Sequence, residues 1–553
     1  MLRNWIFCFL FFGAGSLFAQ IEGIYITGNS QKVLPEGRPN VKGIQFEDIQ
    51  IPGGEQKLKS ALEPFLGQTL STANAIAVKK TIMTYYVSQN KTTVAVSFPE
   101  QKTAGGVMQV LVLTRVVKPI YKGQSWYSNE QLNRYLGINP GHEIAEDTLN
   151  NNMSWINRNP FHYSQAKFVP TDEPNVVDLE ITTKTRSPIR FFGRADDTGS
   201  ASTGYGRFAA GFAWGNAFWI GDLLSFEYDC SNEFKRYQSY IANYTSFLSW
   251  KHILTLMGTY ATVKPFIVKS PNTHIDAVSA DARVHYTIPF KPLYASLQQS
   301  IILGIEYKYT NSNIVGLPGG APVVELIGPP VIQTENLTQL YGNYTITDSF
   351  KNNDISFSID AYGSPMEWLP NQSNADYEQL RPNSKNRYFY TSVTFSEVYT
   401  IPKVGSVSVL LRGQVSNDTL PPTELFSLGG YNTVRGYHEC EYNTDNGFIG
   451  NLEFRTPWMK WGMPVGELLF LAFFDYGIGH DWFVPKMVGV PTPPHTQYLM
   501  GVGPGFRYRI NPYLQARLDY GFKLHHLFTG DSAPVRQLTL GFGQFHVGLL
   551  VSY

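Results

Sequence analysis

The sequence predicts two small α+β domains followed by an all-β barrel of about 16 antiparallel strands that crosses a membrane and encloses an inward-folded loop. The main observation is that, from Pro188 onward, the chain consists of runs of about ten residues in which apolar and polar side chains alternate. Before Pro188, short alternating segments are mixed with segments of helical apolar spacing. Beyond the N-terminus, no apolar run reaches the roughly 18 residues that a membrane-spanning helix needs.

The composition agrees with a membrane barrel and argues against other classes of protein. The 553 residues include 33 Tyr, 36 Phe and 10 Trp, while only 16% are charged, and the mean hydropathy is −0.18. This hydropathy is too low for a bundle of membrane helices. The 44 basic and 44 acidic residues give a formal charge of zero, which argues against nucleic acid as the main partner.

The N-terminus has the pattern of a secretory signal peptide over residues 1–19. Arg3 precedes an apolar core over 5–12, and small residues follow up to Ala19, after which we expect cleavage. Removal of this segment leaves two cysteines, Cys230 and Cys440. They could pair in an oxidising compartment or be unrelated, and two cysteines are too few for a disulfide framework or a zinc site.

The segment before Pro188 divides into a lead and two similar units. Residues 20–40 form a short polar lead with a strand-like apolar pattern, and residues 41–116 form the first α+β unit. Its expected elements are a strand over 44–51, helices over 58–65 and from Thr72, and strands over 94–97 and 107–114.

Residues 117–185 repeat this organisation with shorter parts. The expected elements are helices over 128–136 and 148–159 and a closing strand pair over 161–169 and 176–182. An exposed edge strand in such a unit can accept an extended chain through main-chain hydrogen bonds, with little demand on sequence. We therefore expect these domains to hold unfolded protein.

Residues 186–553 form the predicted barrel. Its strand centres are expected near residues 192, 209, 225, 242, 257, 284, 303, 342, 358, 393, 410, 452, 472, 504, 517 and 541. Short connections alternate with longer loops, as they do between the two ends of a membrane barrel. The barrel must close, because an open sheet edge in lipid would leave backbone groups unsatisfied.

The most distinctive stretch lies in a long loop, from about Asp418 to Asn446, which contains apolar residues able to pack inside the barrel. If Arg435 of this loop turns inward, it requires an acid, because an unpaired buried charge is very costly. Asp475 is the candidate, since the alternation of its strand turns it inward. Glu453 also points inward and competes as a partner, and Arg455 on the same strand is a secondary candidate for the lumen.

Two ordered motifs in this region resemble those of a known superfamily. Val434-Arg435-Gly436-Tyr437 is similar to the VRGF/VRGY loop motif of BamA-type assembly proteins and two-partner secretion transporters. Phe473-x-Asp475-x-Gly477 resembles the strand motif of the same superfamily, whose acid pairs with the loop arginine inside the barrel. Residues 155–160 resemble the signature of the second polypeptide-transport-associated (POTRA) domain. The resemblance covers about residues 41–545.

The resemblance implies an outer-membrane transporter of the two-partner secretion type, with its N-terminal domains in the periplasm. Its implied partners are a large secreted client protein captured by the POTRA domains, membrane lipid, and the barrel assembly machinery that inserts it. It implies no catalytic, cofactor-binding or metal-binding residues, and the sequence has no HExxH, GxSxG or P-loop motif. Such transporters often carry a pore-plugging helix, for which residues 20–40 look too short.

Two alternatives remain open at the level of sequence. The chain could be a BamA-like assembly factor that opens the contact between its first and last strands, or a passive porin or lipase. The end of the chain is also open to two interpretations. Gly543-Gln544-Phe545 resembles the terminal motif of the superfamily, yet the chain continues to Tyr553, so either aromatic could be the terminal one. The outward pattern changes between Phe542 and Phe545, which predicts a bulge or slip there.

Overall fold

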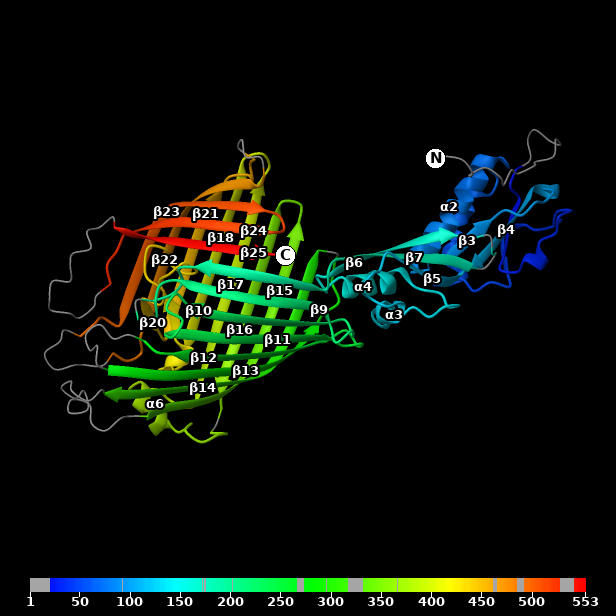
Figure 1. Ribbon diagram of the computed structural model, residues 1–553. Helices are drawn as coiled ribbons and strands as arrows, with labels where there is room; N and C mark the ends of the chain where they lie inside the picture. Colours follow the sequence, from blue (N-terminus) through cyan, green and yellow to red (C-terminus); the bar gives the residue numbers. More distant parts are fainter. Residues whose placement is uncertain are drawn as a thin grey trace. The chain divides into compact units, whose positions relative to one another are not determined.

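The computed structural model describes residues 20–553 except 92, 172, 174, 175, 201, 266–272, 295, 317–331, 366, 461–464, 485–491 and 528–541. The chain divides into two compact units, with the boundary between Arg186 and Ser187 (Figure 1). The proposed signal peptide, residues 1–19, lies outside the described residues.

The first α+β domain has a four-stranded sheet in the order β2-β1-β4-β3. Its elements are β1 (Gly23–Thr27), β2 (Gly43–Glu47), α1 (Glu55–Leu62), α2 (Thr72–Ser88), β3 (Val94–Ser97) and β4 (Val107–Thr114). Apolar residues of α1 and α2 pack against the sheet, where Leu58, Leu62 and Ile82 are fully buried. These periodic apolar positions are the reason why the helices fold onto one face.

The assignment of residues 20–40 as a separate lead was wrong. Its residues 23–27 form β1, which lies between β2 and β4 and runs parallel to both. Ile24 and Ile26 are fully buried in the domain core, so their burial stabilises the segment as a central strand. The rest of 20–40 holds only a short 3-10 helix at Ser30–Lys32, and its described residues contain no α-helix.

The second domain has a three-stranded sheet in the order β5-β7-β6. Its elements are β5 (Val116–Lys122), α3 (Asn129–Leu136), α4 (Glu146–Ile156), β6 (His162–Pro170) and β7 (Val176–Thr185). Ser128 begins α3 with a capping box, in which its side chain and that of Gln131 bond to each other's backbone N–H groups. Strands β5 and β6 are the two edges of the sheet.

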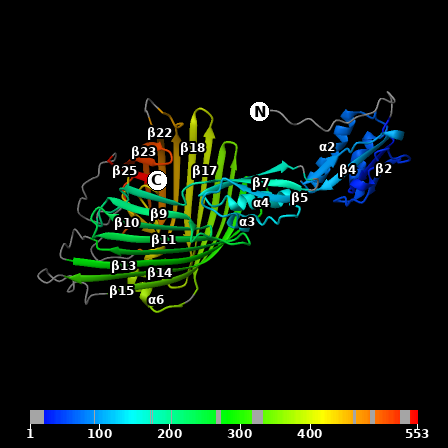
Figure 2. The ribbon, with the colours of Figure 1, turned by 45° about the vertical axis from the view of Figure 1, so that its right-hand side comes forward.

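The second unit is a closed barrel of sixteen strands, each antiparallel to its neighbours, which confirms the predicted fold class. Figure 2 shows the same strands side by side from a second direction. The barrel strands are β8 (Ile189–Asp196), β9 (Arg207–Ala217), β10 (Asp222–Ser231), β11 (Tyr237–Phe247), β12 (Ile253–Val263), β13 (Thr273–Pro289), β14 (Leu297–Gly316), β15 (Ile332–Phe350), β16 (Asn353–Ser364), β17 (Tyr388–Ile401), β18 (Gly405–Ser416), β21 (Asn446–Arg455), β22 (Glu467–His480), β23 (Thr496–Ile510), β24 (Leu514–Lys523) and β25 (Gly543–Ser552).

Every predicted strand centre except the last falls inside an observed barrel strand. Residue 541, the last predicted centre, lies outside the described residues, and the final strand β25 begins at Gly543. Phe545, on the outward face of β25, and Tyr553, directly after the strand, are both exposed, at 58% and 87%. The backbone of Tyr553 exchanges two hydrogen bonds with that of Phe191, so the pairing continues one residue beyond the end of β25.

The barrel closes where β25 pairs with β8. This register covers Gly548–Ser552 against residues 196–192, which is shorter than the pairing of either strand with its other neighbour. Among the described residues, no helix is long and apolar enough to cross a membrane. Cys230 and Cys440 are free thiols, the first buried and the second exposed.

Candidate functional site in the barrel lumen

The loop between β18 and β21 folds into the barrel and packs against the inner wall. Its short strands β19 (Phe426–Leu428) and β20 (Tyr442–Thr444) pair as an antiparallel hairpin. One apolar cluster joins the loop to the wall, and its buried members are Phe426, Leu428, Val434, Tyr437, Ile449 and Leu499. The apolar residues that distinguish this loop in the sequence therefore hold it inside the barrel.

A second set of contacts fixes the two ends of the loop. Arg381, which follows the short helix α6 (Asn374–Leu380), bonds to the carboxylate of Asp445 and to the backbone oxygen of Leu420. Asp445 is fully buried. On the way into the lumen, buried Glu424 accepts a hydrogen bond from Lys308 Nζ at 2.7 Å and another from the Tyr390 hydroxyl at 2.6 Å.

At the tip of the loop, Gly436 packs against Gly521 of the barrel wall so closely that neither position has room for a larger residue. Gly436 has φ +96°, a conformation that favours glycine. Opposite it on β24, a Cβ added to Gly521 would lie 2.3 Å from the Gly436 nitrogen. The Gly436 N–H donates to His546 Nε2 on β25 at 3.1 Å, so the tip is bonded to the last strand of the barrel.

Arg435 lies beside Gly436 and is 3% exposed. Its Nε and Nη2 donate to the two oxygens of Asp475 at 2.7 and 2.8 Å, and its backbone N–H donates to Asp475 Oδ2 at 3.1 Å. The guanidinium carbon lies 3.5 Å from the centroid of the Phe473 ring. The two side-chain hydrogen bonds form a bidentate pair, the geometry in which arginine binds a carboxylate most strongly.

Arg435 also contacts the competing acid and one that the sequence analysis missed. Its Nη1 donates to Glu453 Oε1 at 2.7 Å and lies 3.5 Å from Asp519 Oδ2. Asp475 remains the main partner, because it receives three hydrogen bonds from Arg435 whereas Glu453 receives one. Asp475 also accepts from Asn451 Nδ2 at 2.7 Å, which leaves its buried carboxylate well bonded.

The network as a whole is balanced in charge. Arg455 pairs with Glu453 at 2.7 Å, and Arg507 forms two hydrogen bonds to Asp519 at 2.6 and 2.9 Å. Three arginines, including Arg435, thus face three carboxylates. Burying charges is costly unless each is paired and hydrogen-bonded, and this arrangement meets that condition.

The structure brings most of the predicted motif residues together. Val434 and Tyr437 anchor the tip on either side of Arg435, and Phe473 lies against its guanidinium. Gly477 leaves room for Val434, since an added Cβ would lie 2.8 Å from the Val434 Cγ2 atom. Arg455 reaches the network only through Glu453.

Sequence reasoning missed Asp519, Arg507, Asn451 and His546. The alternation of β24 carried a signal for Asp519, because exposed Leu518 places its neighbour on the inner face. Nothing in the sequence pairs His546 with the loop, since their contact spans 110 residues. Within the described residues, no group of three His, Cys, Asp or Glu side chains could hold a metal ion.

Comparison with known proteins agrees with this architecture. The family model of the haemolysin secretion/activation protein ShlB/FhaC/HecB matches residues 176–264 and 331–482. The outer membrane transporter CdiB of Dickeya dadantii is 21% identical over 408 residues, covering 72% of this chain and 68% of the relative. The heme/hemopexin transporter protein HuxB of Haemophilus influenzae is 21% identical over 493 residues, covering 84% and 80%.

Solved structures share the fold at low sequence identity. CdiB from Escherichia coli superposes with a TM-score of 0.69 at 16% identity, covering 98% of this chain and 92% of that one. BamA from Haemophilus ducreyi, lacking POTRA domains 1–3, gives a TM-score of 0.51 at 13% identity, covering 94% and 100%. By these matches the chain is similar to the haemolysin secretion/activation family, and its fold is that of an outer-membrane β-barrel transporter.

Proposed function

We propose that this chain secretes a large partner protein, which its periplasmic domains capture and which then passes through the barrel. The observation that carries the proposal is the seated loop, whose tip is held in the lumen by the arginine–carboxylate network around Arg435. No step of this function requires bond chemistry in the transporter. The network holds the loop in one defined position until the client arrives.

Capture is assigned to the open sheet edges of the N-terminal domains. On the edge strand β6, the Asn157 side chain bonds to both the N–H and the C=O of Ser164, at 2.7 and 2.9 Å, as a neighbouring strand would. Because backbone groups alternate along a strand, those of Ala166 and Phe168 point to the same open edge. An extended client segment could continue the sheet there through main-chain hydrogen bonds.

The client can pass through the barrel only if the loop moves and leaves part of the lumen open. The tip and its wall contacts involve β21, β22, β24 and β25, so the loop is bonded to the part of the barrel next to the closing seam. A client entering the lumen would compete with these contacts. Such competition couples client entry to movement of the loop, since a ligand shifts an equilibrium only through contacts that differ between the two states.

A second function, assembly of other barrel proteins, is favoured by one observation. The register of β25 with β8 covers five residue pairs, extended by backbone hydrogen bonds between residues 553 and 191 and between 197 and 547, and it is still shorter than the register of either strand with its other neighbour. A factor that opens this seam would release client strands into the membrane, whereas a secretion transporter releases client into the medium.

The test is secretion in cells that lack other two-partner systems. The chain would be expressed with a large exported protein encoded beside its gene, and the client would be measured in the medium, the periplasm and the outer membrane. Full-length client in the medium only when the transporter is present supports secretion. Client that stays in the outer membrane as a folded barrel supports the assembly function instead, and client that stays in the periplasm contradicts both.

A further inference from the structure

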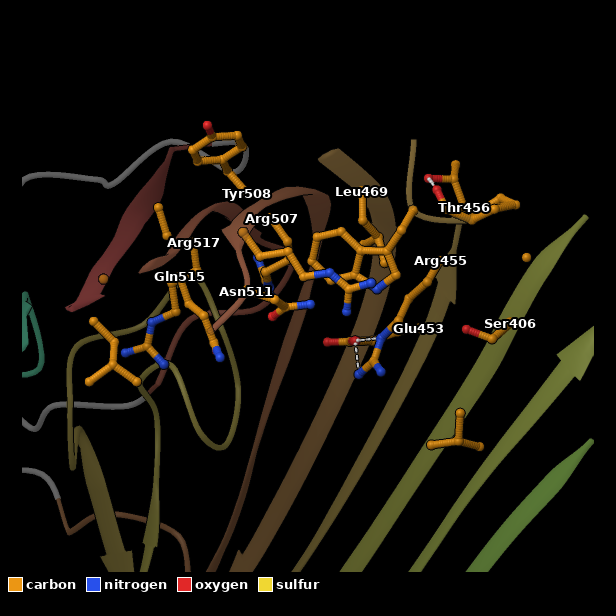
Figure 3. Close-up of a pocket in the computed structure, with 18 of the residues that line it drawn as sticks. Ser406, Glu453, Arg455, Thr456, Leu469, Arg507, Tyr508, Asn511, Gln515 and Arg517 are labelled. Carbon is orange, nitrogen blue, oxygen red and sulfur yellow. Dashed lines mark hydrogen bonds and ion pairs between the residues drawn. The ribbon is translucent and has the colours of Figure 1, made fainter. Parts of the chain in front are cut away.

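A cavity of about 970 Å³ lies at the end of the barrel where the strands have short connections, which is the periplasmic end. Lys403 and Asn511 from two of these connections line it, and Tyr431 and Asn432 from the loop tip also face it. Figure 3 shows arginine side chains from neighbouring strands around this cavity. A client entering from the periplasm would meet it before the Arg435 network.

Most of the arginines that line the cavity are already paired with acids. Arg507 bonds to Asp519, and Arg455 bonds to Glu453. Arg509 donates twice to Glu467, at 2.8 and 2.9 Å, and Arg194 donates to Asp229 at 2.8 Å. These four guanidinium groups are therefore already bonded to carboxylates of the barrel wall.

Arg517 differs from the others. Among the described residues, its Nε is buried and has no hydrogen-bond partner, and Arg517 forms no ion pair, although the carboxylates of Asp197 and Glu439 lie close enough to interact with its charge. Its guanidinium carbon lies 3.5 Å from the centroid of the Tyr431 ring. Gly548 on the adjacent strand leaves room for it, because an added Cβ would lie 2.3 Å from the Arg517 Nε atom. The barrel thus places a guanidinium group without an acidic partner against the cavity wall, while the other unpaired cation among the described lining residues, Lys403, lies in a connection at the rim.

The rest of the lining suits a peptide better than a small inorganic anion. Side-chain amides and hydroxyls can bond to peptide N–H and C=O groups, and they belong to Asn432, Asn511, Gln515, Thr198, Thr400, Ser406 and Thr456. Trp458, with Arg509 3.8 Å above its ring, and Leu469 add apolar surface. The volume lies at the upper end of the range for ligand sites, far above what a single anion fills.

We propose that this cavity binds an extended segment of the client and that Arg517 receives an aspartate or glutamate side chain of that segment. Arginine binds a carboxylate through two parallel N–H groups, and among the described residues the terminal Nη1 and Nη2 groups of Arg517 have no partner, so they can supply these two donors while the buried Nε stays against Gly548. The inference rests on the proposed secretion function. It deepens that function by naming acidic segments of the client as those that bind the lumen most tightly. Tyr431 belongs to the loop tip, so the segment would bind directly beside the part of the loop that must move.

The test uses the purified full-length chain in detergent micelles and two fluorescent Gly–Ser peptides, one carrying two aspartates and the other two asparagines. Fluorescence anisotropy gives the affinity of each. We expect the aspartate peptide to bind the wild type about tenfold more tightly, the value of one hydrogen-bonded charge pair. Arg517→Gln should abolish this preference, and Arg517→Lys should keep part of it because the charge remains.

The matched control is Arg412→Gln. Arg412 faces the lumen from β18, opposite exposed Leu411, but it does not line the cavity. This variant should keep the full preference, and heat-modifiable gel mobility should show that all variants are folded. Equal binding of both peptides by the wild type, or a preference that survives Arg517→Gln, overturns the proposal. Loss of the preference in Arg412→Gln overturns it too, since the general lumen charge would then be responsible.

These results separate the cavity from the proposed function. Peptide binding is measured without secretion, so a wild type that releases client but binds neither peptide refutes the cavity site alone. A wild type that binds the aspartate peptide but releases no client in cells refutes the secretion function.

Discussion

Replacing Arg435 with alanine should release the loop tip from the barrel wall without unfolding the barrel. The variant loses two side-chain hydrogen bonds to Asp475 and one to Glu453, and it leaves three carboxylates facing two arginines. Removing one partner of a buried pair costs about 3–5 kcal/mol. Because Asp475 keeps its bonds to Asn451 and to the backbone of residue 435, we expect the lower value, about 3 kcal/mol.

This energy changes the population of the unseated loop by roughly 150-fold, since about 1.4 kcal/mol corresponds to a factor of ten. Hydrogen exchange of the backbone amides of residues 435 and 436 measures it directly, because both donate to wall residues in the seated loop. Exchange should accelerate by about that factor at these amides and should not change in the strands. Arg412→Ala, which removes a lumen arginine outside the network, should leave exchange at both amides unchanged.

A double-mutant cycle then identifies the main acid. The coupling of Arg435 to Asp475 should exceed its coupling to Glu453, because Asp475 receives the bidentate contact. The charge swap Arg435→Asp with Asp475→Arg should recover part of the secretion lost in either single variant. A larger coupling to Glu453, or unchanged exchange in Arg435→Ala, would refute the reasoning.

Three further predictions concern other parts of the chain. Gly521→Ala should unseat the loop tip and reduce secretion, because its Cβ would lie 2.3 Å from the Gly436 nitrogen, and faster exchange at residue 436 would report it. In the second N-terminal domain, burial lowers the pKa of His162 from 6.5 to about 4. The folded domain therefore favours neutral His162, so its stability is complete above pH 6.5 and is lost as the pH falls toward 4. Urea unfolding of fragment 20–186 should give about 2 kcal/mol less stability at pH 5 than at pH 7, and His162→Phe should show a smaller loss. Deletion of residues 20–186 should leave a barrel that inserts, by heat-modifiable mobility, but no longer releases client into the medium; full secretion by this barrel would contradict the capture role.

The barrel could be predicted because its signal is local. Each spanning strand must turn apolar side chains to lipid, so alternation in one short segment reveals both the strand and its inward face. That alternation turned Asp475 inward, and the need to neutralise a buried arginine linked it to the loop. The same reasoning applied to Leu518 would have added Asp519 to the network.

Features that depend on contacts between distant segments could not be predicted in this way. Ile24 and Ile26 looked like a strand, but periodicity does not say which sheet a strand joins. The bonds of Arg381 to Asp445 and of Gly436 to His546 link loops and strands far apart in the sequence. Such contacts leave no periodic pattern in either partner, so only the folded arrangement reveals them.

Cross-linking of a client arrested during export tests most directly whether the client passes through the lumen. With the native cysteines replaced by serine, a single cysteine would be placed on β24, either at Gln515, which lines the cavity, or at Leu518, which is exposed on the outer face. A client carrying a stable folded domain at its C-terminus and cysteines along its exported segment would be trapped in transit. We predict a disulfide-linked complex with the Gln515→Cys variant and none with Leu518→Cys. Cross-linking at residue 518 without cross-linking at residue 515 would contradict passage through the lumen.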